Sequence, residues 1–169
     1  MRILGVDPGS LATGYGLIQM DGPKLLHVCH GVIRPPAKIA LAEKLLIIFR
    51  ELSEIIQQHS PQAFAIEKVF VAKNAASALK LCHARGVAMM AGAQHQIPVF
   101  EYSALQVKSA VVGYGKADKK QVQHMTRMLL KLPAAAQLDA SDALAVAICH
   151  GHSRHLESKV SRILSSSSG

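Results

Sequence analysis

Residues 2–10 of the chain read Arg-Ile-Leu-Gly-Val-Asp-Pro-Gly-Ser. The apolar run that begins at Ile3 is typical of a short buried strand, and Asp7 stands where this strand ends. The Pro-Gly-Ser that follows has the residues of a turn. An isolated carboxylate beside an apolar core is costly unless a cation or a proton offsets its charge. The stretch therefore predicts a buried strand that delivers an acidic group to one edge of a sheet.

Three further acidic residues lie beside apolar segments. Glu67 follows the run Ala-Phe-Ala-Ile at 63–66, and Asp139 and Asp142 open an apolar, helix-like stretch that continues to Ile148. The chain has only 11 acidic residues against 19 Lys and Arg, so placing four acids beside the core requires a shared counter-charge. A divalent metal is the natural partner of clustered carboxylates, and a metal held in this way in a basic protein suggests phosphodiester chemistry.

The composition fits one domain that binds a polyanion. The 169 residues are 50% hydrophobic, and the formal net charge of +8 favours nucleic acid as the partner, with a merely soluble basic protein as the alternative. The absence of Trp argues against a single-strand binder built on stacking. Three widely spaced cysteines predict reduced thiols in the cytoplasm rather than a disulfide framework or a zinc site. We expect no signal peptide and no membrane span.

The hydrophobic pattern predicts an α/β fold with a mixed five-stranded sheet flanked by helices. We expect a single domain over residues 1–152 and a polar, mobile tail over 153–169. The helix at 75–94 is apolar nearly all round, which indicates either burial under a neighbouring helix or a subunit interface. The expected strands are 3–7, 14–20, 27–34, 63–67 and 98–102, and the expected helices are 38–58, 75–94, 103–112, 118–132 and 139–150.

This arrangement predicts that the acidic residues meet. A helix separates the strands that end at Asp7 and Glu67, so the two strands can lie in parallel with their carboxyl ends at one edge. Asp139 and Asp142 are three residues apart and share one helix face. Helix capping explains that pair equally well when it is taken alone, but capping does not explain Asp7 and Glu67.

At these residues the chain resembles the RuvC-type Holliday junction resolvases of bacteria over about residues 1–152. The resemblance is carried by residues 3–10 with Thr13–Gly16, by 65–70 (Ala-Ile-Glu-Lys-Val-Phe), by 70–80, and by 139–145 (Asp-Ala-Ser-Asp-Ala-Leu-Ala). It implies a ribonuclease H-like fold, a homodimer and Mg²⁺-dependent paired nicking of four-way junction DNA in recombination and repair. It also implies a branch-migration helicase complex as a further partner.

The resemblance assigns roles to single residues. The family's four catalytic carboxylates fall on Asp7, Glu67, Asp139 and Asp142, where some members carry His at the last position. Its catalytic-site lysines fall on Lys108 and Lys119, and the aromatic wedge at the junction centre falls on Phe70. We expect the carboxylates to hold two Mg²⁺ ions, with Asp7 bridging them and Mn²⁺ able to substitute.

Other interpretations of the sequence remain open. A solvated surface is the default interpretation of the basic stripe Lys120, His124, Arg127 and Lys131, and phosphate contact is the alternative. The turn after Asp7 also imitates the phosphate loop of sugar-kinase ATPases, although those enzymes need two domains. A non-catalytic junction binder fits the charge but not the four acids. Another nuclease of the same fold, acting on RNA–DNA hybrids or other DNA, fits both.

Overall fold

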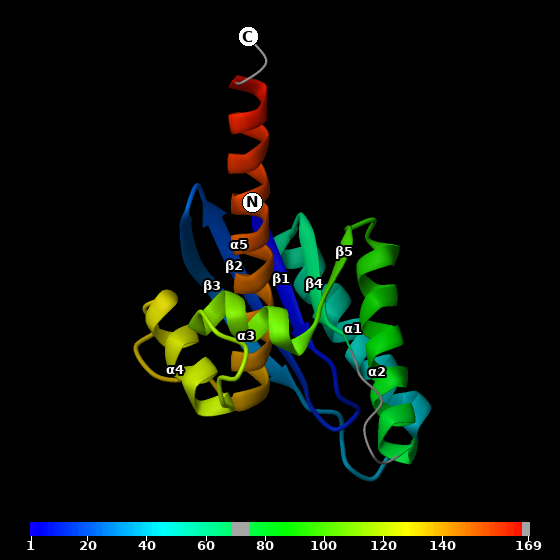
Figure 1. The fold of residues 1–169 in the computed structure, drawn as a ribbon. Helices are drawn as coiled ribbons and strands as arrows, with labels where there is room; N and C mark the ends of the chain where they lie inside the picture. Colours follow the sequence, from blue (N-terminus) through cyan, green and yellow to red (C-terminus); the bar gives the residue numbers. More distant parts are fainter. Residues whose placement is uncertain (69–74, 167–169) are drawn as a thin grey trace.

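The structure is a computed structural model that describes residues 1–68 and 75–166. One five-stranded sheet with the order β3-β2-β1-β4-β5 forms its centre (Figure 1). Strand β1 pairs antiparallel with β2 and parallel with β4, while β2–β3 is antiparallel and β4–β5 is parallel. The mixed sheet expected from the sequence is confirmed. The strands are β1 (Arg2–Asp7), β2 (Thr13–Asp21), β3 (Lys24–Ile33), β4 (Ala63–Glu67) and β5 (Val99–Tyr102).

Helices cover both faces of this sheet. Helices α1 (Leu41–His59) and α2 (Ala75–Gln94) pack on one face with Leu4, Val6 and Phe64. The other face, which carries Ile3 and Ile18, is covered by three helices. Alternating side chains of a strand point to opposite faces, so successive residues of β1 enter different halves of the core. The three helices are α3 (Ala104–Val112), α4 (Lys119–Leu129) and α5 (Leu138–Ser166).

Glycines let α5 approach the sheet at backbone distance. A methyl group at Gly5 would overlap the backbone of Ala143, and one at Gly14 would overlap the carbonyl of Asp139. Residues 143–149 of α5 are all buried. The helix therefore forms the centre of one half of the core, and its amino-terminal end is held against β2.

Helix α5 differs most from its expected length. It does not end near His150 but continues to Ser166, so residues 153–166 are helical. In Figure 1 this part rises beyond the sheet as a separate arm. Helix α4 is shorter than expected, because Lys131 adopts a left-handed conformation (φ 52°) outside it. None of the helices within the described residues combines the length and apolar character that a bilayer crossing requires.

Candidate active site

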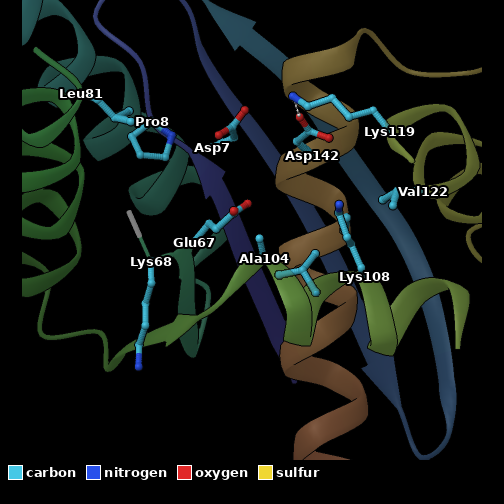
Figure 2. Close-up of a pocket in the computed structure, with 12 residues that line it drawn as sticks. Asp7, Pro8, Glu67, Lys68, Leu81, Ala104, Lys108, Lys119, Val122 and Asp142 are labelled. Carbon is cyan, nitrogen blue, oxygen red and sulfur yellow. Dashed lines mark hydrogen bonds and ion pairs between the residues drawn. The ribbon is translucent and has the colours of Figure 1, made fainter. Parts of the chain in front are cut away.

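The sheet brings Asp7 and Glu67 together at one edge. Strands β1 and β4 run in parallel with Val6 opposite Ile66, so the acidic residue that ends each strand follows at the same level. Helix α5 supplies Asp142 beside them. Figure 2 shows the three carboxyl groups facing a common space, which is a cavity of about 440 Å³. The expected convergence of Asp7, Glu67 and Asp142 is therefore seen in the structure.

The electrostatics of this cavity are unfavourable for negative charge. Burial is the main reason that the pKa of Asp7 rises from 3.8 to about 7. The negative charges of Asp142, Glu67 and Asp139 raise it further, while Lys119 acts in the opposite direction. Burial also raises the pKa of Glu67 and that of Asp142. The protein thus holds its carboxylates in a place where a cation would stabilise them.

Two lysines enter the same cavity. Lys119, in the first turn of α4, donates a hydrogen bond to Oδ2 of Asp142 at 3.3 Å. Its position is set by the helix start, where the Asp118 side chain accepts a hydrogen bond from the backbone N–H of Gln121. Lys108 of α3 also lines the cavity, and its positive charge works against the rise in the pKa of Glu67. Both lysines predicted from the sequence therefore lie beside the acidic residues.

Asp139 occupies a different position from the other three acids. It lines a neighbouring cavity rather than the one that contains Asp7. Its Oδ2 lies 3.6 Å from the guanidinium of Arg34, which follows strand β3. Asp139 is still close enough to raise the pKa of Asp7 and of Asp142. It therefore belongs to the edge of the acidic cluster.

Arg85 contacts the backbone of Glu67, and this contact was not predicted from the sequence. It lies on α2, and its Nε donates a hydrogen bond of 3.3 Å to the backbone carbonyl of Glu67. Its guanidinium also forms an ion pair with Glu101 of β5. An Arg in a largely apolar helix has no spacing signal that would distinguish such a contact from surface charge.

The donor set suits a hard divalent cation. Carboxylate oxygens with raised pKa values are ligands that Mg²⁺ prefers, and the open cavity leaves room for water and phosphate oxygens. Within residues 1–68 and 75–166, no three His, Cys, Asp or Glu side chains are grouped closely enough to hold an ion as they stand. Asp7, Glu67 and Asp142 are the residues that would have to close around it.

Two sequence-based expectations are not placed at this site. Phe70 lies outside the described residues. The basic stripe is only partly helical, because Lys131 follows the end of α4, while Lys120 and His124 are exposed on that helix. Arg127 donates a hydrogen bond to the carbonyl of Leu132 at 3.3 Å. Phosphate contact by the stripe stays a prediction.

A mixed five-stranded sheet that carries converging carboxylates at one edge is the arrangement of the ribonuclease H-like class, and such a site suits metal-dependent phosphodiester cleavage. The chain matches the family model described as crossover junction endodeoxyribonuclease RuvC over residues 3–150. It belongs to this family, whose nucleases use divalent metals.

Individual relatives agree with this assignment. The crossover junction endodeoxyribonuclease RuvC of Syntrophotalea carbinolica is 59% identical over 156 residues, which cover 92% of this chain and 97% of that protein. The corresponding protein of Shewanella loihica is 57% identical over 150 residues, which cover 89% of this chain and 86% of that protein. A structure of T. thermophilus RuvC in complex with a Holliday junction substrate has a TM-score of 0.87 at 28% identity, covering 93% of this chain and 96% of that one.

Proposed function

We propose that this chain resolves four-way DNA junctions by cutting two strands at symmetric positions, one in each subunit of a homodimer. Family membership supports the activity. The observation that carries the chemistry is the group of Asp7, Glu67 and Asp142, which face one cavity together with Lys108 and Lys119. A non-catalytic junction binder has no use for acidic groups at a DNA-binding surface, because they repel phosphate.

We assign the central ligand position to Asp7. Its carboxylate carries the largest penalty for negative charge, so a cation placed next to it relieves most of that penalty. Glu67 and Asp142 complete the ligand set, and Asp139 lies at its edge. Two Mg²⁺ ions, for which Mn²⁺ can substitute, would activate a water for attack on phosphorus and stabilise the leaving 3′ oxygen.

The two lysines have separate tasks in this proposal. Lys119 neutralises Asp142 in the absence of DNA, through the contact of 3.3 Å. When DNA is bound, its exposed ammonium group is positioned to contact a phosphate oxygen. Lys108 lines the cavity on the same side as Lys119 and Asp142 and faces Glu67 across it (Figure 2). A positive charge there stabilises the negative charge that develops during phosphodiester cleavage.

We assign the dimer contact to the outer face of α2. An exposed row of small and apolar residues runs along this face at helical spacing. A Cβ at Gly86, in the middle of the row, would meet open space, so another helix can approach closely there. The row faces away from the core that the rest of α2 helps to form, and its members are Leu79, Cys82, Gly86, Met90 and Ala93.

Three further proposals accompany the activity. A cytoplasmic location fits the three free cysteines and the DNA substrate. A branch-migration helicase complex is the expected partner at the junction. The wedge role of Phe70 is also kept as a proposal, which the family resemblance supports.

The first experiment tests the nuclease activity and the role of Asp7. Purified protein is incubated with Mg²⁺ and equal amounts of labelled four-way junction, duplex, single strand and RNA–DNA hybrid. We expect symmetric nicks in the junction only. Asp7→Asn should reduce the nicking rate at least about a thousandfold while it leaves junction binding within about threefold of wild type, because catalysis needs the metal ligand and binding rests mainly on basic residues.

Asp21→Asn is the matched control, because Asp21 is an exposed aspartate at the β2–β3 turn. It should nick at the wild-type rate. Normal nicking by Asp7→Asn would disprove the metal role, and equal cutting of the hybrid would assign the chain to a different nuclease activity of the same fold.

A further inference from the structure

A second cavity lies directly beside the one that contains Asp7. Its volume is about 660 Å³, and Leu81 of α2 lines both cavities. Residues Asp7 and Pro8 line the first cavity, and the following residues 9–12 line the second. The turn after β1 therefore separates two adjoining recesses. We call the second one the flanking cavity.

Lys44 places a buried ammonium group in the wall of the flanking cavity. It lies on the buried face of α1, in register with Ile48 and Leu52, and only 9% of its surface is exposed. Its Nζ donates one hydrogen bond, of 2.8 Å, to the carbonyl of Ala37. An ammonium group has three N–H bonds, and none of the ion pairs among the described residues includes Lys44.

A buried cation of this kind calls for an anion. Burying a charge is costly unless it is paired, and a neutral carbonyl compensates only part of that cost. Lys80 of α2 adds a second, exposed ammonium group to the wall of the same cavity. Asp139 also lines it, but the guanidinium of Arg34 lies 3.6 Å from that carboxylate and offsets its charge.

We infer that Lys44 and Lys80 bind a backbone phosphate of the cut DNA strand, close to the phosphate that is cleaved. This inference rests on the proposed nuclease function. Because the two cavities adjoin across the Asp7–Pro8 turn, a strand held at the acidic site passes next over the flanking cavity. A phosphate there receives charge-assisted hydrogen bonds and sets the register of the strand relative to the metal ligands.

The test removes the phosphate charge and the lysines separately. Junctions are prepared with a single neutral methylphosphonate at each position within three nucleotides of the cut. Binding by the full chain is measured in EDTA by fluorescence anisotropy. We expect one position at which the neutral linkage weakens wild-type binding about tenfold and weakens binding by the variant Lys44→Met/Lys80→Met less than twofold, because this variant no longer has the ammonium groups that the phosphate would meet.

Several controls keep a structural effect of Lys44 apart from DNA binding. Lys80→Met alone should show part of the reduced response to the methylphosphonate. Because the Lys80 side chain is exposed, this variant should fold as wild type does. Lys44→Arg keeps the charge and should bind within about threefold of wild type. Lys24→Met removes the same charge from an exposed site at the β2–β3 turn and should respond to the methylphosphonate as wild type does.

The salt dependence of binding provides a second readout. The slope of log Kd against log salt should fall by about 0.9 in the double lysine variant, because this variant neutralises one phosphate fewer than wild type does. If wild type nicks junctions but no methylphosphonate position distinguishes it from the double variant, the phosphate site is disproved while the nuclease function stands. If wild type nicks no junction at all, it is the proposed function that fails.

Discussion

At the scale of single residues, the fold places the Asp7 carboxyl where its negative charge lowers the stability of the folded state. The pKa of its carboxyl is raised to about 7, with burial as the largest cause. The folded protein therefore binds this proton more tightly than the unfolded chain does between about pH 4 and pH 7. As pH rises through this window without metal, the folded state loses stability.

This leads to a prediction for Asp7→Asn in EDTA. The variant should have a higher free energy of unfolding than wild type at pH 8, by at most about 4 kcal/mol, since one pKa unit corresponds to about 1.4 kcal/mol. The difference should be smaller at pH 5, where the Asp7 of the folded wild type is mostly protonated. Urea unfolding at both pH values measures this difference. Burial lowers the pKa of His150 to about 4, and comparing the two proteins cancels its contribution because both contain it.

Added Mg²⁺ should raise the stability of wild type and leave Asp7→Asn almost unchanged. A variant that is less stable than wild type at pH 8 would mean that the Asp7 carboxylate makes a net stabilising contact, contrary to the electrostatics of the cavity. Asp21→Asn serves again as the control, with no change expected at either pH.

The residues of the site differ in how well the sequence reveals them. Asp7 and Glu67 could be predicted because each ends an apolar run, and parallel pairing then brings them together. The side chain of Asp139 could not be placed, because its partner Arg34 comes from a distant strand end. Lys44 was missed because a lysine within an apolar stripe looks like an interruption of that stripe, although here it is buried with it.

At the scale of elements, the close contact between α5 and the sheet sets the position of the acids on that helix. Gly14 of β2 faces Asp139, and Gly16 faces Leu144, which follows Asp142 by two residues. Any side chain at these positions pushes the start of α5 away from the edge where Asp7 and Glu67 end. The distance between the strand acids and the helix acids therefore depends on glycine.

Gly14→Ala tests this dependence. The added methyl group overlaps the Asp139 backbone, so α5 must shift. We expect the Mg²⁺ concentration that gives half-maximal nicking to rise at least about fivefold, together with a loss of stability of about 1–3 kcal/mol from overpacking. Mg²⁺ titrations of the nicking rate and thermal unfolding measure the two effects.

Gly22→Ala is the control for stability. Gly22 has φ 56° in the β2–β3 turn and open space around it, so Ala costs about 1 kcal/mol in backbone strain without touching the site. Its Mg²⁺ titration should match that of wild type. Equal Mg²⁺ titrations for Gly14→Ala and wild type would show that the glycine contact does not position the acids.

Element boundaries were predicted well where burial imposes the pattern and poorly elsewhere. Strand β4 was expected at 63–67 and is found there, because nearly all its side chains are buried. The carboxyl-terminal half of α5 was expected to be a polar tail. The sequence does contain a helical pattern there, because Leu156, Val160 and Ile163 have helical spacing. All three side chains are exposed, so they do not belong to the buried pattern that marks the other helices.

At the scale of the whole molecule, the proposed activity requires two copies of the acidic site. One chain carries one such cavity among its described residues, so paired nicks in a junction need a dimer. The exposed row along α2, from Leu79 to Ala93, lies on the opposite side of the α1–α2 layer from the core. A helix from a second copy would cover it.

Gly86→Glu tests the dimer. Within one chain the new side chain meets open space, and replacing a helical Gly improves helix propensity, so the fold should be kept. In the dimer, two carboxylates would be buried against each other. We expect sedimentation to show a monomer in place of a dimer at concentrations where wild type is dimeric, and paired nicking to be abolished.

Gln57→Glu adds the same charge to an exposed position of α1 and should remain dimeric. A Gly86→Glu variant that sediments like wild type would remove α2 as the interface. Gln57→Glu should make paired nicks in the junction and Gly86→Glu should not, because a monomer cannot place two sites on one junction.

Helix α5 has one more consequence, for the way the molecule fluctuates. The same helix supplies Asp142 and the buried residues 143–149, so its backbone cannot open locally without exposing the centre of the protein. Its amides in that stretch should exchange with deuterium only through complete unfolding. Adaptation to a bound junction must then come from the segments around the helix. Asp142 therefore stays in place, and Asp7 and Glu67 move relative to it.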